Sequence, residues 1–451
     1  MAQINKPIMK HMIAARLGGM TVLQNAITAG LAEKLCLIID LGGRLRVLAK
    51  LGDHHDRAAI ENRLGPELQT ACEDYWARDI WFDREKTHPM GKAGPAEVAL
   101  FLKVWGEAKA EPAGQNQVFT LDRRYSKEAW FSTDVEAVWK VGGQMPPIVS
   151  FYSYKGGVGR TTALAALAIQ FARAGKRVLV MDFDLEAPGI GSVFSAGSAM
   201  PDAGVLDFLL EYPVVGNAFD PAEMLYSFDN QSVIKNGEPI FVAAAGTVDE
   251  WYLEKLGRLN YPGLSESLAP SRGRDSAMKV LFHKLRAQAK PDLILIDSRA
   301  GLHDLGGLTL CGLAHWHVLF GLDSEQSWLG LRVAVARLGK EQILGGRTQR
   351  DIVVVHSMVP PQDGKEESIE RFRQQAFDVF RAEYYNDPAD ANAEWPLPDA
   401  KATEEPHYSI PLIYDNKVMG YRSLEKVANY LCEGDFGAFG NAVAKKVGLK
   451  L

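Results

Sequence analysis

Short, uninterrupted apolar runs recur along the last two thirds of the chain, separated by longer stretches with helical periodicity. The runs lie at residues 147–152, 177–182, 239–243, 293–297, 317–322 and 351–356. Strands that are apolar on both sides are typical of a parallel sheet covered by helices on both faces. We therefore predict that residues 146–451 form an α/β domain with a doubly wound, mostly parallel sheet.

The first 145 residues follow a different pattern. Helical stretches at 12–34, 56–76 and 96–108 are mixed with strand-like runs at 36–40, 44–49, 117–121 and 135–141. Glycine and proline cluster at 141–147, and such a cluster is typical of a boundary between two domains. The pattern predicts a smaller α+β domain over residues 1–145, which we expect to act as a sensor or to bind a protein partner.

The composition is that of an ordinary globular protein, with 47% apolar and 24% charged residues. A formal charge of −6 does not indicate a nucleic-acid-binding coat, although a local basic patch stays open. The four cysteines lie far apart, which fits reduced thiols. The first residues lack the apolar core of a signal peptide, and no apolar run approaches the roughly 20 residues that span a bilayer. We therefore expect a cytoplasmic protein.

A glycine-rich loop follows the first apolar run of the larger domain and precedes a helical stretch. Over residues 151–162 it reads Phe-Tyr-Ser-Tyr-Lys-Gly-Gly-Val-Gly-Arg-Thr-Thr. Glycines let the backbone curl so that its N–H groups point inward, and the helix N-terminus adds further donors for phosphate groups. A hydroxyl at Thr161 suits a Mg²⁺ ligand, and one at Thr162 can reach an α-phosphate. The residues predicted to bind the nucleotide here are Gly156, Gly157, Val158, Gly159, Arg160, Thr161 and Thr162.

This loop resembles the deviant Walker A motif, KGGVGKTT, of the ParA/MinD family of P-loop ATPases. Two positions differ, since Tyr154 replaces the family's first glycine and Arg160 replaces its phosphate-binding lysine. Lys155 matches the family's signature lysine, which reaches across a dimer interface to the partner's nucleotide. The resemblance therefore implies a homodimer with ATP at its interface. The KGGVGR form of the loop is similar to that of bacterial ATPases linked to defence gene neighbourhoods.

Aspartates follow two of the apolar runs. Asp182 and Asp184 lie at the end of the second run, and Asp297 ends the run at 293–297. In a parallel sheet these carboxylates lie at the same edge as the loop, where they can hold Mg²⁺ or orient an attacking water. They resemble the switch and Walker B elements of the same family. The resemblance implies Thr161, Asp182 and Asp297 as metal ligands and Lys155, Arg160 and Asp184 as catalytic residues.

Two later segments match places where ATPases of this family approach the base. Ser357 follows the apolar run at 351–356, and Pro411 belongs to a segment that resembles the family's IPxD loop. The resemblance implies that both residues contact the nucleotide. The expected cofactors are therefore ATP and Mg²⁺.

We expect an ATPase that forms ADP and phosphate and works as a dimeric switch in bacterial defence or signalling. Its turnover depends on whether Arg160 can replace the usual lysine. One alternative is a positioning ATPase that acts on nucleoid DNA or a membrane, and another is an effector enzyme whose first domain is gated by the ATPase. A P-loop tyrosine kinase is disfavoured, because no tyrosine cluster follows Tyr430.

Two further patterns have an ordinary structural interpretation. The Asp53-His54-His55-Asp56 segment resembles part of the DHH phosphoesterase motif, but the other acidic motifs of those enzymes are missing. A solvated helix start is the favoured interpretation. Phe436, Phe439, Val443 and Val447 form a helical apolar stripe, which is typical of a terminal helix packed on a sheet as well as of a membrane-binding helix. We favour packing on the sheet and expect no membrane partner.

Overall fold

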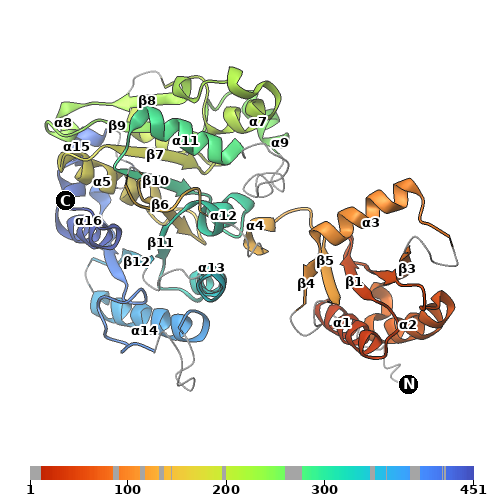
Figure 1. Cartoon of the computed structure of the whole chain (residues 1–451). Helices are drawn as coiled ribbons and strands as arrows, with labels where there is room; N and C mark the ends of the chain where they lie inside the picture. The colour runs from red at the N-terminus through yellow and green to blue at the C-terminus, as the bar shows by residue number, and fades with distance from the viewer. Residues whose placement is uncertain are drawn as a thin grey trace, which may run out of the picture. The chain divides into compact units, whose positions relative to one another are not determined.

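The computed structural model describes residues 12–451 apart from 85–90, 112–116, 132–136, 144, 196–199, 260–276, 346–350, 362, 386–396, 419 and 421–422. The chain divides into two compact units, Met1–Tyr125 (unit 1) and Ser126–Leu451 (unit 2). Each unit has its own sheet and its own buried core (Figure 1).

The boundary between the units lies earlier than the sequence predicts. The segment after Tyr125 belongs to unit 2, because two of its tryptophans are buried there. Trp130 packs edge-on against Tyr152, and Trp139 packs edge-on against Phe282. Five tryptophans precede the glycine–proline cluster, and the sequence alone does not show that these two serve the second core.

The described strands of unit 1 form a sheet in the order β3-β2-β1-β5-β4. They are β1 (Lys34–Ile39), β2 (Leu45–Leu51), β3 (Trp76–Arg84), β4 (Lys109–Ala110) and β5 (Val118–Asp122). Helices α1 (Met12–Thr28) and α2 (Arg57–Cys72) cover one face, and α3 (Pro95–Glu107) covers the other (Figure 1). The mixed α+β architecture agrees with the sequence pattern, but β3 begins inside the predicted helix 56–76, and the described residues 137–141 form no strand.

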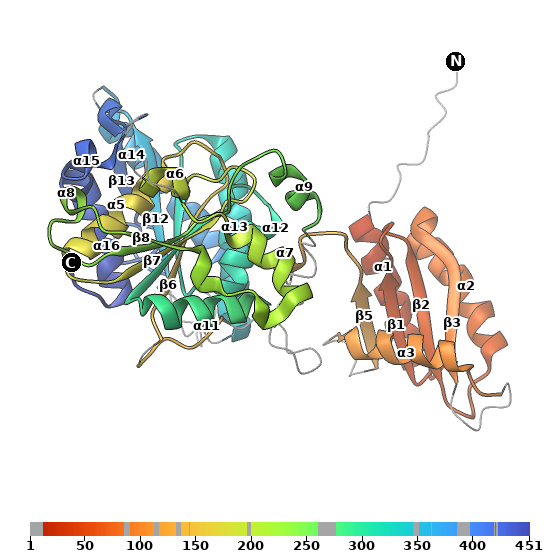
Figure 2. The ribbon, with the colours of Figure 1, turned by 90° about the horizontal axis from the view of Figure 1, so that it is seen from above.

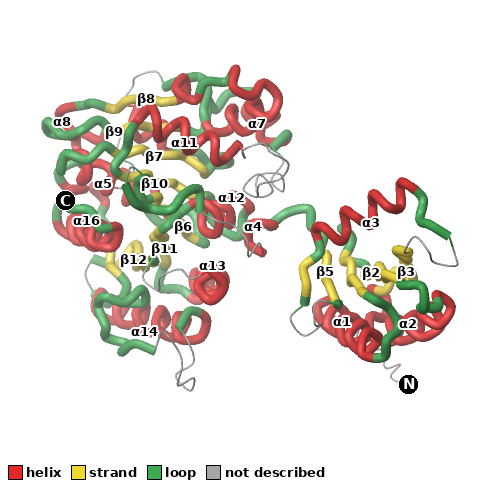
Figure 3. The backbone as a smooth tube through the Cα atoms, in the orientation of Figure 1, coloured by secondary structure: helices red, strands yellow, loops and turns green. Residues whose placement is uncertain are grey.

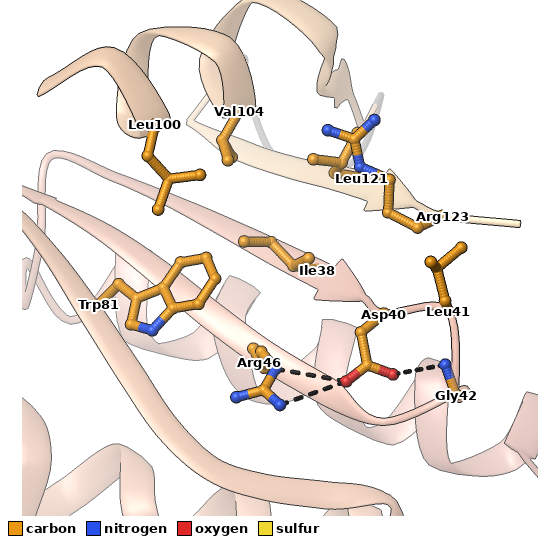
Figure 4. Close-up of a pocket in the computed structure, with 10 residues that line it drawn as sticks. All are labelled: Ile38, Asp40, Leu41, Gly42, Arg46, Trp81, Leu100, Val104, Leu121 and Arg123. Carbon is orange, nitrogen blue, oxygen red and sulfur yellow. Dashed lines mark hydrogen bonds and ion pairs between the residues drawn. The ribbon is translucent and has the colours of Figure 1, made fainter. Parts of the chain in front are cut away.

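A pocket of about 370 Å³ lies between α3 and the sheet of unit 1. Its middle is apolar and one end is charged, where the turn between β1 and β2 contributes Asp40 (Figure 4). The apolar side chains are Ile38, Trp81, Leu100, Val104 and Leu121. Asp40 accepts hydrogen bonds from Arg46 and from the N–H of Gly42, so the charged end is held in place by the hairpin itself (Figure 4).

Among the described residues of unit 2, eight strands form a sheet in the order β13-β12-β11-β6-β10-β7-β9-β8. They are β6 (Ile148–Ser153), β7 (Val178–Phe183), β8 (Leu225–Phe228), β9 (Ile240–Ala243), β10 (Leu293–Ser298), β11 (Trp316–Gly321), β12 (Ile352–Val359) and β13 (Ile410–Ile413). Every described pairing is parallel except β8 with β9. The predicted fold class is confirmed, and each of the six apolar runs forms a strand.

Helices cover both faces of this sheet, as the fully apolar strands predict (Figure 3). One face carries α5 (Arg160–Arg173), α6 (Ile190–Ser195), α8 (Gln231–Ile234), α15 (Leu424–Val427) and α16 (Gly434–Val447). The other carries α4 (Glu128–Phe131), α7 (Val205–Val215), α11 (Ala277–Ala289), α12 (Asp304–Leu308), α13 (Glu325–Gly345) and α14 (Lys365–Glu383). Figure 2, seen from above, shows β6 and β7 between α5 and α11.

The C-terminal helix α16 packs on the sheet. Phe439 is fully buried and stacks edge-on against Phe151 of β6, and Phe436 and Val443 lie in the same core. The favoured interpretation of the apolar stripe is thus confirmed. No helix in the described part of the chain is long and apolar enough to cross a membrane.

Tyr154, which replaces a glycine of the resembled motif, packs against Gly330 of α13. A Cβ added at Gly330 would lie 1.9 Å from Cγ of the tyrosine ring, so any side chain there displaces Tyr154. We expect Gly330→Ala to lower the free energy of unfolding by about 1–3 kcal/mol, the usual cost of overpacking. Chemical denaturation measures this change.

Gly257, the last residue of α9 (Tyr252–Gly257), is the matched control, since a Cβ there meets no atom within 4 Å. Gly257→Ala should stay within about 0.5 kcal/mol of the wild type. Equal stability of the two variants would show that Tyr154 is not wedged against α13.

Candidate functional site

The glycine-rich loop joins the buried strand β6 to the helix α5 in the centre of the sheet. Gly157 and Gly159 have φ values of 72° and 76°, a left-handed conformation that strains other residues. A Cβ at Gly156 or Gly157 would meet no atom within 4 Å, so this side of the loop is open. Val158 is buried and holds the loop against the domain. The loop therefore presents backbone to an open space, as a phosphate-binding loop requires.

Ser357 supports the loop through a hydrogen bond. Its hydroxyl is buried in the second half of β12 and donates to the carbonyl oxygen of Val158. Pro411 lies half-buried in β13 and pairs with His356 of β12. The contact of Ser357 and Pro411 with a base stays a prediction, and the structure adds a supporting role for Ser357 that the sequence does not reveal.

Arg160 is the most constrained residue of the site. Its Nε donates to Oδ1 of Asp297 at 2.7 Å, and its Nη2 donates to Oδ2 of Asp184 at 2.8 Å. Its Nη1 donates to the hydroxyl of Ser153 at 2.8 Å, and this hydroxyl in turn donates to the carbonyl of Lys155. Only 7% of Arg160 is exposed. Its guanidinium thus lies against the strand ends.

Burial opposes the charged form of Arg160, but the charges of Asp297 and Asp184 and their hydrogen bonds outweigh it. The pKa of Arg160 is therefore raised above its usual value. The guanidinium is a permanent cation whose two carboxylate partners are also buried. Such an arrangement is stable only while all partners are present.

The two carboxylates that bind Arg160 have further partners. Thr161, in the first turn of α5 beside the half-buried Thr162, donates its hydroxyl to Oδ2 of Asp297 at 2.5 Å. Nη1 of Arg299 donates to Oδ1 of Asp184 at 2.8 Å. Each carboxylate oxygen of Asp184 and Asp297 therefore already accepts a hydrogen bond.

Asp182 serves the backbone. It is fully buried at the end of β7 and accepts hydrogen bonds from the N–H groups of Asp184, Gly189 and Ile190. Burial, and then the nearby charge of Asp297, raise the pKa of Asp182 to about 8, while the three N–H donors act in the opposite direction. Its oxygens shape the turn after β7.

The donor set predicted for Mg²⁺ does not fit a metal ion as the residues lie. Thr161 and Asp297 are brought together as predicted, but Thr161 donates its hydroxyl to Asp297, Asp297 is paired with Arg160, and Asp182 binds backbone N–H groups. Among the described residues, no group of three or more His, Cys, Asp or Glu side chains is placed to hold a metal. A divalent cation here would also lie beside the guanidinium groups of Arg160 and Arg299.

Lys155 is placed differently from Arg160. It is half-buried, and its Nζ lies 5.6 Å from the centre of the Tyr154 ring. A cation over an aromatic face gains about 0.5–1 kcal/mol at exposed sites, which a charged ligand can readily replace. Lys155 therefore loses little free energy if its Nζ leaves the Tyr154 ring.

Sequence reasoning missed two residues of the site. Arg299 follows the Walker B-like run, and no sequence pattern assigns it a role. In the structure its Nη2 also binds Glu186 at 3.0 Å. Ser153 ends β6 and connects Arg160 to the loop. A charged residue directly after the Asp297-Ser298 pair is the only local signal for the first, and the second has none.

The comparisons with known proteins agree with this geometry over the loop. Residues 147–193 match a family model described as an AAA domain. An uncharacterized ATP-binding protein of Methanocaldococcus jannaschii is 41% identical over 54 residues, which are 12% of this chain. The chain spans about a fifth of that relative's length, since the match covers 20% of it. Both matches lie over the segment that holds β6, the glycine-rich loop and α5, or over a short part of the chain, and they agree with the P-loop architecture seen there.

Solved ParA- and MinD-type structures are also similar to this chain. The cell division ATPase MinD of Pyrococcus furiosus is 19% identical over 67% of this chain and 99% of its own, with a TM-score of 0.40. The pNOB8 ParA bound to nonspecific DNA is 17% identical over 67% and 99%, with a TM-score of 0.44. A Cyanothece McdA–ATP complex is 14% identical over 69% and 99%, with a TM-score of 0.45. Over residues 147–193, the match to the AAA domain model agrees with the P-loop resemblance that the motifs predict.

The buried arginine makes a clear prediction for stability. Arg160→Met leaves Asp184 and Asp297 buried without their shared cation, so we expect a loss of about 3–5 kcal/mol in the free energy of unfolding. Arg332 is the matched control, because its side chain is more than half exposed in its ion pair with Glu383.

Arg332→Met should cost at most about 1 kcal/mol. Denaturant titration of both variants measures the difference. Similar losses for the two would mean that Arg160 is not held by the buried pair.

Proposed function

We propose that unit 2 binds ATP on the loop at 154–162 and hydrolyses it slowly, so that the bound nucleotide acts as a switch. The observation that carries the proposal is the open, left-handed glycine backbone at Gly157 and Gly159, held between β6 and α5. Its N–H groups and the N-terminus of α5 favour a phosphate chain. Lys155, whose Nζ lies over the Tyr154 ring, supplies positive charge beside the loop.

Slow turnover follows from the state of Asp184. A residue that orients and activates an attacking water needs a carboxylate that is basic enough to take part of the water's proton. Both oxygens of Asp184 accept from guanidinium groups, one from Arg160 and one from Arg299. These two cations compete with a water for Asp184 and make its carboxylate less basic, which lowers the rate of hydrolysis.

The same proposal includes a homodimer in which Lys155 reaches the partner's nucleotide. With ATP present, the wild type should bind the nucleotide and dimerise, and Lys155→Ala should dimerise at least about tenfold more weakly, because one charge-assisted bond per site is lost. Calorimetry measures binding, light scattering measures mass, and phosphate release measures turnover.

Lys34 of unit 1 is the matched control, since its Nζ lies 5.5 Å from the centre of the Phe119 ring in a similar contact. Lys34→Ala should behave as the wild type. Absence of binding to ATP, ADP and GTP would refute the whole proposal, and an unchanged dimer of Lys155→Ala would refute the role of Lys155.

A switch needs an element that responds to the nucleotide, and the segment after β10 is placed for that role. Its Gly301 N–H donates to the carbonyl of Ser153 next to the loop, at 3.0 Å. At its other end it holds α4, where Lys127 pairs with Asp304 at 2.7 Å and the indole of Trp130 donates to the carbonyl of His303 at 2.8 Å. Unit 1 ends just before α4 in the chain. A shift of this segment would therefore reach the connection to unit 1.

We expect ATP to change the amide hydrogen exchange of residues 299–308 and of residues 126–131 together. Trp130→Phe keeps an aromatic ring but removes the hydrogen bond to His303, so the response of 126–131 should shrink by about half or more while that of 299–308 persists. Exchange mass spectrometry with and without ATP measures both.

Trp328 is the matched control, because it is a buried tryptophan of α13 in the same core cluster. Trp328→Phe should leave the response of 126–131 intact. Exchange in 126–131 that ignores ATP in the wild type would contradict the coupling.

The variant loop and unit 1 suggest the biological role of the switch and its kind of partner. The resemblance to the KGGVGR form supports a role in bacterial defence or signalling, and the mostly apolar pocket between α3 and the sheet offers a place for a protein partner's side chain. In this scheme unit 1 recognises the partner and the nucleotide on unit 2 sets when the signal is passed on.

A further inference from the structure

The guanidinium of Arg160 lies across the carboxyl ends of three neighbouring strands. It binds Ser153 at the end of β6, Asp297 in β10, and Asp184 directly after β7. In the sheet these strands stand in the order β6-β10-β7. The three donors of this one side chain thus connect the ends of three strands directly beside the glycine-rich loop.

The charges of this edge are already balanced by protein groups. The carboxylates of Asp184 and Asp297 are paired with the guanidinium groups of Arg160 and Arg299, and the hydroxyl of Thr161 takes the remaining oxygen. A divalent metal would have to share these carboxylates with two guanidinium cations in a buried place, where repulsion between like charges is strong.

We propose that Arg160 supplies the positive charge that a metal ion would otherwise bring to this edge, so that the site binds a nucleoside di- or triphosphate without requiring a divalent metal. The inference rests on the proposed nucleotide binding and specifies the ionic form of the ligand, a metal-free phosphate chain. Loop N–H groups and Lys155 hold the phosphates, and Arg160 neutralises the aspartates that would repel them.

Arginine is suited to this task and lysine is not. A planar guanidinium has donors in fixed directions, and Arg160 uses Nε, Nη1 and Nη2 for three different partners. A lysine ammonium is a compact point charge on one atom, and it cannot bridge Asp184 and Asp297 in the same way. Replacing the arginine by lysine would leave carboxylate oxygens open to a metal.

The test measures the affinity of the full chain for ADP by calorimetry, once with excess Mg²⁺ and once with excess EDTA. ADP avoids turnover, so the readout is binding alone. We expect the two dissociation constants of the wild type to agree within about fivefold, because guanidinium groups already neutralise Asp184 and Asp297. A larger loss of affinity in EDTA would overturn the inference while leaving nucleotide binding intact.

Failure to bind ADP in both solutions would instead remove the proposed function, and the inference with it. The two failures are therefore distinguishable. The wild-type comparison needs no substitution, so it holds even where a variant folds poorly.

Arg160→Lys tests the assignment to this side chain. The dissociation constant for ADP in EDTA should rise to about tenfold or more above that in Mg²⁺, since the guanidinium that bridges Asp184 and Asp297 is lost. Arg173 lies on the same helix and donates to the carbonyl of Val233, so Arg173→Lys is the matched control and should keep the wild-type ratio. An unchanged ratio in Arg160→Lys would show that another group closes the site to metal.

Discussion

The ion pairs of Arg160 with Asp184 and Asp297 fix the geometry of everything around the loop. They join the first residue of α5 to the ends of β10 and β7, and the bond to Ser153 adds β6. Removing three charged groups from water costs several kcal/mol for each, and only nearly complete hydrogen bonding offsets this. The helix start, the strand ends and the loop therefore form one rigid unit, in which no member can move alone.

A continuous chain of polar contacts leads away from this centre. It runs through Arg160, Asp184, Arg299, Glu186, His303 and Trp130. The consecutive side-chain bonds from Arg160 to His303 measure 2.8–3.0 Å. Coupling between distant places needs a physical network with alternative arrangements. Here Arg299 joins the rigid unit to Glu186 and His303, so in the proposed switch a phosphate chain that drew Arg299 away from Asp184 would alter the support of α4.

Much of this domain could be predicted from the sequence because its signals are local. Fully apolar runs predict strands buried on both faces, and the glycine spacing predicts the loop. The missed features depend on contacts between distant residues: Arg160 and Asp297 are 137 positions apart, and Ser357 and Val158 are 199 apart. The burial of Trp130 and Trp139 in the core of unit 2 also depends on contacts between distant residues, so the sequence alone does not reveal it. Strand β3 was missed because its half-buried positions interrupt the apolar pattern that marks the other strands.

The two departures from the resembled motif are each matched by a residue elsewhere. Tyr154 needs a neighbour without a side chain, and Gly330 of α13 provides it, since a Cβ there would overlap the ring. Arg160 needs several acceptors, and Ser153, Asp184 and Asp297 provide them. A loop that had merely lost its function would leave such substitutions with strain and unpaired charge. The matched partners indicate instead a loop of altered design, in which a fixed guanidinium and an aromatic ring replace the lysine and the glycine of the resembled motif.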